Sequence, residues 1–222
     1  MPPASAPLVV LLTGFGPFPG APINPAAALV RRLSRLRRPR LAGTRLAAHV
    51  FPTRYQAVDC EWPALLASLR PDIVLMVGLA SRRRQISVET RACNAVSTLV
   101  PDAAGNYAAA VIAPGAPATR RFNLPAQPLA RAIAMSGTPA KVSHDAGRYV
   151  CNYLSWRVLE AAGKPGGPAV AAFIHLPRPR PSGSRRGSRR PLPAQRELQR
   201  AIENALLSAI AIARVRRRMR NP

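Results

Sequence analysis

Cysteine is scarce in this 222-residue chain, and acidic residues, lysine and long apolar runs are scarce as well. Cys60, Cys93 and Cys151 are odd in number and unevenly spaced, which argues against a disulfide framework and for a reducing compartment such as the cytoplasm. The apolar run 8–12 has no basic flank and is too short to span a bilayer. We therefore expect neither a signal peptide nor a membrane helix.

Negative charge is also in short supply, because nine acidic residues face 33 basic ones and the net charge is +24. Clustered arginine neutralises phosphates, so nucleic acid is one interpretation. The strong preference for arginine over lysine, with abundant Ala, Pro and Gly, looks instead like the bias of a GC-rich genome, and the aromatic residues that stack on single-stranded bases lie elsewhere. Nucleic acid is therefore the less favoured partner. The arginines crowd into 31–40, 81–84, 178–191 and 214–220.

The first 80 residues carry the pattern of an α/β fold. Continuous apolar runs at 8–13 and 72–78 are typical of buried parallel strands, and 45–51 is a third candidate strand. Helical patterns at 26–36 and 55–69 separate them, the first opened by Asn24 and Pro25. This alternation predicts a parallel sheet with helices on its faces.

The remainder of the chain continues this α/β pattern less regularly. We expect strands at 85–94, 140–143 and 168–175, short strands around 109–112, and helices at 128–135 and 194–214. The arginine- and proline-rich segment 178–192 cannot bury apolar area and is expected to be mobile. With 48% apolar residues, 1–222 suits a single domain.

Segment 143–163 places a cysteine near the start of a predicted helix. Ser143 and Gly147 precede the helical pattern and Gly163 ends it, so Cys151 falls in about the first turn. Unpaired N–H groups and the helix dipole there favour a thiolate, which is the nucleophilic form. The alternative is that Cys151 is a small buried hydrophobe.

Three features are expected at the carboxyl ends of the strands, where functional sites of parallel sheets collect. They are the Gly/Phe/Pro turn at 14–18, the start of the Cys151 helix, and His175 at the end of its strand. Cys151, His175 and Glu89 meet the chemical needs of a nucleophile, a base and an orienting carboxylate. On chemistry alone, a purely structural role for these residues stays equally open.

Four sequence blocks resemble signatures of the pyroglutamyl peptidase I family, also called pyrrolidone-carboxylate peptidases. They cover most of 8–177 in the family's order: LLTGFGPF with NPA (11–26), ISVETRACN (86–94), GRYVCNYL (147–154) and FIHLP (173–177). The resemblance implies a three-layer α/β/α sandwich of the phosphorylase/hydrolase type with a mainly parallel, twisted sheet. It also implies removal of N-terminal pyroglutamyl residues from peptides, with no cofactor and no metal.

By this resemblance Cys151, His175 and Glu89 form the catalytic triad. His175 takes and returns the proton while Glu89 holds the imidazole tautomer. Asp102 is the competing carboxylate for the third role.

The same resemblance assigns residues that bind the substrate ring. Phe15 and Phe18 sandwich the ring, Tyr149 and Val150 line the cavity, and Asn24 helps to shape it. The turn that holds both phenylalanines is also explained by packing alone.

Several positions depart from the family pattern. Arg82 stands where the family has a small residue, so that Arg83 would be the family's arginine, and Ala103 and Ala104 follow Pro-Asp where the family has Asn. Segment 178–192 is another departure. These differences leave open a weakly active or inactive relative that serves as a basic, nucleic-acid-binding module. The family also suggests a homo-oligomer, a tetramer, and no membrane partner.

Overall fold

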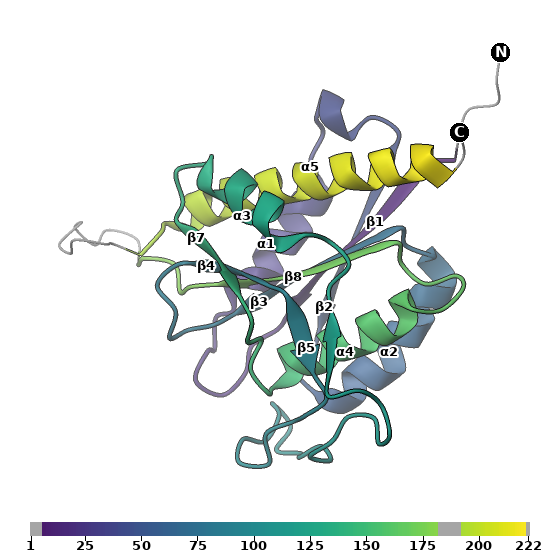
Figure 1. Cartoon of the computed structure of the whole chain (residues 1–222). Coiled ribbons are helices and arrows are strands. Elements are labelled where there is room, and N and C mark those ends of the chain that lie inside the picture. Colours follow the sequence, from purple (N-terminus) through teal and green to yellow (C-terminus); the bar gives the residue numbers. More distant parts are fainter. Residues whose placement is uncertain (1–5, 182–191, 221–222) are drawn as a thin grey trace.

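A computed structural model describes residues 6–181 and 192–220 (Figure 1). Most of the segment expected to be mobile, 178–192, therefore lies outside the described residues. A six-stranded sheet with the strand order β2-β1-β3-β8-β4-β7 forms the centre. The strands are β1 (Leu8–Phe15), β2 (Thr44–Phe51), β3 (Ile73–Leu79), β4 (Ile86–Glu89), β7 (Ala140–Ser143) and β8 (Val170–Leu176).

The sheet is mainly parallel, with one reversal. Strands β2, β1, β3 and β8 run parallel to one another, whereas β4 pairs antiparallel with β8 and parallel with β7. This reversal carries the carboxyl end of β4 away from the carboxyl ends of the first four strands. Glu89, the last residue of β4, nevertheless reaches the side chain of His175 because β4 and β8 are neighbours.

Helices cover both faces of the sheet, which gives the expected three-layer α/β/α architecture (Figure 1). Helices α1 (Pro25–Ser34), α3 (Ala126–Ala134) and α5 (Gln195–Arg220) pack on one face, and α2 (Tyr55–Leu69) and α4 (Val150–Ala162) pack on the other. A short 3-10 turn, η1 (Pro39–Leu41), leads into β2. No helix in the described ranges has the length and apolar character needed to cross a bilayer.

Alternation along the central strands explains their continuous apolar sequences. Ile73, Leu75 and Val77 of β3 pack under α1 and α5, while Val74 and Met76 pack under α2 and α4. Both faces are covered, so both sets must be apolar. Residues two apart on a strand share a face, so Gly78, which follows Met76, and His175, which follows Phe173, also face the α2/α4 layer.

Two expectations about strands were wrong. The strand predicted at 85–94 is broken at Thr90, where the backbone turns from β7 toward a second, two-stranded sheet made of β5 (Arg91–Cys93) and β6 (Thr119–Arg121). The short strands expected at 109–112 are absent from the described structure. There the side-chain amide of Asn94 donates a hydrogen bond to the carbonyl of Ala113 and accepts one from its N–H. These two bonds take the place of the hydrogen bonds that a neighbouring strand would make.

The other predicted strands and helices are confirmed with small changes at their ends. α5 runs past the predicted residue 214 to Arg220, and β8 continues one residue beyond His175.

Candidate functional site

Cys151 is the second residue of α4, as the sequence predicted. Tyr149 occupies the N-cap position in an extended conformation and makes no side-chain capping bond, and Gly147 turns the chain before it at φ +76°. The first N–H groups of a helix have no partner within the helix. The N–H of Cys151 is therefore available to an oxygen atom bound beside the sulfur.

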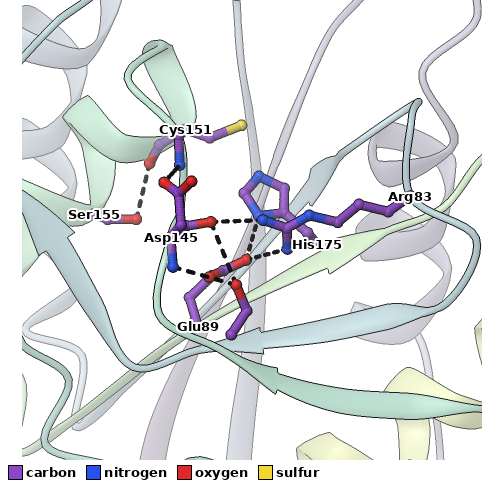
Figure 2. A network of polar contacts seen from close by, with 8 residues as sticks. Arg83, Glu89, Asp145, Cys151, Ser155 and His175 are labelled. Atoms are coloured by element: carbon purple, nitrogen blue, oxygen red, sulfur yellow. Dashed lines mark hydrogen bonds and ion pairs between the residues drawn. The ribbon is translucent and has the colours of Figure 1, made fainter.

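The sulfur of Cys151 lies on the sheet directly above Gly78. A Cβ built on Gly78 would be 2.8 Å from this sulfur and 2.8 Å from the ring of Phe173. Gly78 is the register partner of His175 on the neighbouring strand, and both residues face α4. The sulfur therefore lies over β3, the strand next to the one that carries the imidazole. Figure 2 draws Cys151 beside His175 and Glu89, with a dashed line between the last two and none from the sulfur.

An ion-paired chain runs from His175 to Arg83 (Figure 2). Nδ1 of His175 lies 2.8 Å from Oε1 of Glu89, and the guanidinium of Arg83 donates to the same oxygen at 2.5 Å. Arg83 also donates to the carbonyl of Asp145 at 2.6 Å. The Glu89 side chain is 0% exposed. The carboxylate is therefore held in one orientation beneath the imidazole.

The pKa values at the site follow from burial and these contacts. Burial lowers the pKa of His175 below its usual value, and the charge of Arg83 lowers it further, although Glu89 opposes both. Burial alone would raise the pKa of Glu89, but the hydrogen bond and charge of His175, the nearby hydroxyl of Ser143 and the charge of Arg83 lower it overall. At neutral pH the site holds a carboxylate next to a neutral imidazole.

The expectation of a favoured thiolate was wrong for the free protein. Burial, followed by the negative charge of Glu89, raises the pKa of Cys151 to about 12, although Arg83 and the backbone N–H act in the opposite direction. The helix terminus is too weak to offset burial of a charge. No hydrogen bond joins the sulfur to the imidazole among the described residues. Although the Cys151 side chain keeps some solvent exposure, the direction of this shift favours a thiol in the resting protein.

Asp102 lies outside this cluster. Its carboxylate accepts backbone N–H bonds from Tyr55, Ala104 and Asn106, at 3.1, 2.8 and 3.0 Å. These bonds close the loop that follows β5. Ala103, one of the departures, donates its N–H to the carbonyl of Thr53 in the same loop. Asp102 therefore holds a loop, and it makes no bond to His175.

The five residues expected to bind the substrate ring divide into two groups. Phe18 and Tyr149 are half-buried, and their rings lie 6.1 Å apart beside the start of α4. Phe15 is 1% exposed and packs on Phe51, and Val150 is fully buried in the same apolar cluster.

Asn24, the fifth of these residues, acts on the backbone. Its side chain caps α1 by accepting from Ala26 and donates to the carbonyl of Gly16. Asn24 therefore shapes the turn that carries the two phenylalanines.

The sequence offered no motif that assigns a role to two residues that position the site, Gly78 and Asn152. Asn152 is fully buried and bonds the backbone of Cys93 and Ala95 three times, which fixes the start of α4 against β5. Gly78 is the last residue of a predicted strand, and Asn152 directly follows Cys151. Their positions next to these predicted features were the only indication in the sequence that they contribute to the site. The resemblance to the family had already singled out Arg83 rather than Arg82, but it did not predict the bond from Arg83 to Glu89.

The other departure, Arg82, is exposed in the turn after β3. It donates to no residue of the His175 cluster, since that contact is made by Arg83. In the described part of the chain, His, Cys, Asp and Glu side chains form no group of three or more that could hold a metal ion.

Comparison with known proteins gives a consistent result. The family model for pyroglutamyl peptidase matches residues 8–211. The pyrrolidone-carboxylate peptidase of Thermococcus onnurineus is 36% identical over 182 residues, which is 78% of this chain and 89% of that protein. The enzyme of Escherichia fergusonii is 33% identical over 205 residues, covering 91% and 93% of the two chains.

Solved structures agree with the sequence comparisons. The pyrrolidone carboxyl peptidase of Thermococcus litoralis superimposes with a TM-score of 0.82 at 28% identity, covering 92% of this chain and 94% of that chain. The pyroglutamyl peptidase I of Bacillus amyloliquefaciens gives 0.78 at 31% identity, with 92% and 97% covered. Because the family model and the relatives match over most of the chain, this protein belongs to the pyroglutamyl peptidase family.

Proposed function

We propose that this protein is a cysteine peptidase that removes the N-terminal pyroglutamyl residue from peptides. The observation that carries the proposal is the position of the Cys151 sulfur above Gly78, beside the strand that presents the His175–Glu89–Arg83 chain. A nucleophile, a base and an orienting carboxylate are the parts that acyl transfer needs. The family membership supplies the substrate class.

The proposed reaction begins with a thiol and a neutral imidazole. Glu89 accepts the hydrogen on Nδ1 of His175, so Nε2 carries the lone pair that acts as the base. Rotation of the Cys151 side chain about Cα–Cβ brings the sulfur toward Nε2, which takes its proton as the sulfur attacks the pyroglutamyl acyl carbon. The carbon–sulfur bond forms, and the carbonyl oxygen becomes an oxyanion that the N–H of Cys151 stabilises.

The tetrahedral intermediate then collapses. The bond to the peptide nitrogen breaks, and the imidazolium of His175 gives its proton to the leaving amine. A water molecule next attacks the thioester, with His175 again as the base, and free pyroglutamate and the thiol of Cys151 are released. The high pKa of Cys151 gives His175 a full general-base role, because no preformed thiolate is present.

The aromatic residues support a neutral ligand. In this proposal Phe18 and Tyr149, whose rings lie 6.1 Å apart, enclose the flat ring of the substrate, and the buried Phe15 and Val150 support them. A free α-ammonium group would lose its hydration in such a place without gaining a partner. We therefore expect pyroglutamyl peptides to be cleaved and peptides with an unblocked glutamyl terminus to be left intact.

The test is hydrolysis of a chromogenic pyroglutamyl amide, with the unblocked glutamyl amide in parallel. We expect turnover of the first amide alone, abolished by Cys151→Ala. Cys60→Ala is the matched control, because Cys60 is an exposed cysteine on α2 and should leave turnover unchanged. Turnover that survives Cys151→Ala, or a folded wild-type protein that cleaves neither amide, would rule out the proposal. The second result would instead support an inactive relative.

A further inference from the structure

Two arginine-rich segments that are far apart in the sequence meet at the amino-terminal ends of the strands. Arg214, near the end of α5, donates to the carbonyls of Arg40 at 3.1 Å and Ala42 at 2.6 Å. In Figure 1 the carboxyl-terminal half of α5 runs beside the start of β1. The arginine runs 31–40 and 214–220 are therefore far apart in the sequence, but the fold brings their positive charges to one end of the molecule.

Two adjoining hollows lie at this end. One, of about 670 Å³, runs between the end of α1 and the start of β2, and the other, of about 480 Å³, runs between β1 and the end of α5. Both are lined by Pro39 and Ala42, so they form one continuous surface, which we call the basic cleft. No acidic side chain lines it among the described residues. Its arginines are Arg37, Arg38, Arg45, Arg214, Arg217 and Arg218.

Four of these six arginines already have structural partners. Arg38 forms an ion pair with Glu203 at 2.9 Å, and Arg37, Arg214 and Arg217 donate to backbone carbonyls. A carbonyl satisfies hydrogen-bond donors but leaves the positive charge in place. Arg37, Arg45 and Arg218 are exposed and make no ion pair in the part of the chain that the structure describes. The basic cleft thus concentrates positive charge, with the carboxylates of Glu203 and Asp72 at its edges.

We propose that the basic cleft binds the phosphate backbone of double-stranded nucleic acid. The planar fork of arginine fits phosphate oxygens in pairs, and release of counterions favours a polyanion over a single phosphate. No Phe, Tyr or Trp lines the cleft, so it lacks the stacking platform on which single-stranded bases bind. Contacts of this kind read no sequence, because they reach only the backbone.

The basic cleft and the candidate active site lie at opposite ends of the strands. Arg45 is near the start of β2, and His175 is near the end of β8, which runs in the same direction. A bound duplex therefore leaves the peptidase site open. The sequence argued against nucleic acid from the preference for arginine over lysine and from the lack of aromatic residues among the arginine runs. The fold nevertheless joins two of those runs into one surface.

The experiment measures binding of a fluorescent duplex DNA of mixed sequence to the full chain, at salt concentrations from about 50 to 200 mM. The cleft variant carries Arg37→Gln, Arg45→Gln and Arg218→Gln. The matched control carries Arg121→Gln, Arg131→Gln and Arg200→Gln, which are exposed, lie outside the cleft and remove the same charge. Thermal unfolding of each variant checks the fold, and this readout does not depend on peptidase activity.

We expect the cleft variant to lose about tenfold or more in affinity at low salt. Its slope of log affinity against log salt should fall by about 2 to 3, because each lost phosphate contact removes about 0.9. The control should lose far less. Equal losses in both variants would show a response to net charge alone and overturn the proposal. Tighter binding of the wild-type chain to anionic phospholipid vesicles than to the duplex would overturn it as well.

Discussion

The sulfur of Cys151 occupies the space that a side chain on Gly78 would fill. A Cβ at that position would lie 2.8 Å from the sulfur, and the ring of Phe173 blocks the other direction at the same distance. The ring of Phe173 cannot withdraw easily, because Phe173 is fully buried in the α2/α4 layer. The absent side chain at residue 78 therefore sets where the nucleophile lies relative to His175.

Gly78→Ala should displace the sulfur and reduce kcat by about 100-fold, which is the scale of loss for a misplacement of about 1 Å. Overpacking should also cost about 1–3 kcal/mol of stability. Kinetics and thermal unfolding together measure both effects. Gly163→Ala is the control, because its Cβ would meet atoms at 3.8 Å and 3.9 Å, which is ordinary contact. A Gly78→Ala enzyme with unchanged kcat would contradict this account.

The pH dependence of kcat/KM should show a broad plateau. The pKa of His175 is lowered, so its neutral, basic form persists below pH 6.5, and the acid limb should fall below that value. The pKa of Cys151 is about 12, so no titration of the thiol should appear between pH 7 and 9. The direct check is a pH titration of the ultraviolet absorbance of the thiolate, taken as the difference between the wild-type protein and the Cys151→Ala variant. A thiolate signal near neutral pH would indicate a preformed ion pair instead.

Arg83→Met should move the acid limb to higher pH. The guanidinium lowers the pKa of His175, so removing its charge raises that pKa and leaves less neutral imidazole at a given acidic pH. We also expect kcat/KM on the plateau to fall about 10- to 100-fold, since Glu89 loses the group that fixes it. Arg82→Met, at the exposed neighbour, should change neither quantity. A lower kcat/KM without any shift of the acid limb of the pH profile would indicate that Arg83 has a structural role alone.

Glu89→Gln and Asp102→Asn separate the two candidate carboxylates. Glu89→Gln should reduce kcat by about 10²- to 10⁴-fold, because the imidazole loses its orienting acceptor and the partner of its cation. Asp102→Asn should leave the pH profile unchanged and lower stability by about 1–2 kcal/mol, because it weakens bonds to loop N–H groups. A larger kinetic effect at Asp102 would reverse the assignment.

Asn152→Ala should destabilise the protein more than an ordinary surface substitution. It leaves the N–H and carbonyl of Cys93 and the carbonyl of Ala95 without their partner, and buried unsatisfied groups cost about 1–3 kcal/mol each. Denaturant unfolding measures the loss. Asn204→Ala is the comparison, because that half-buried amide makes one bond, to Ala132, and should cost less than about 1.5 kcal/mol. Equal losses would disprove the anchoring role.

The sequence by itself determined most of the helices and strands of the fold. It also determined which three residues, Cys151, His175 and Glu89, come together at the candidate site. Apolar runs such as 72–78 had to be buried strands because both faces of the sheet are covered, and the turn before Cys151 had to begin a helix. The GRYVCNYL and FIHLP blocks were local patterns, so no long-range information was needed to recognise them. His175 and Glu89 are bonded in the structure as the sequence predicted.

Only the tertiary structure decided the properties that depend on neighbours distant in sequence. The reversal of β4, the bond from Arg83 to Glu89, and the contact between Cys151 and Gly78 arise from packing. The protonation of Cys151 was mispredicted for the same reason, because a helix terminus is local while burial by surrounding elements is not. The arginine runs likewise become one surface because Arg214 is bonded to the carbonyls of Arg40 and Ala42.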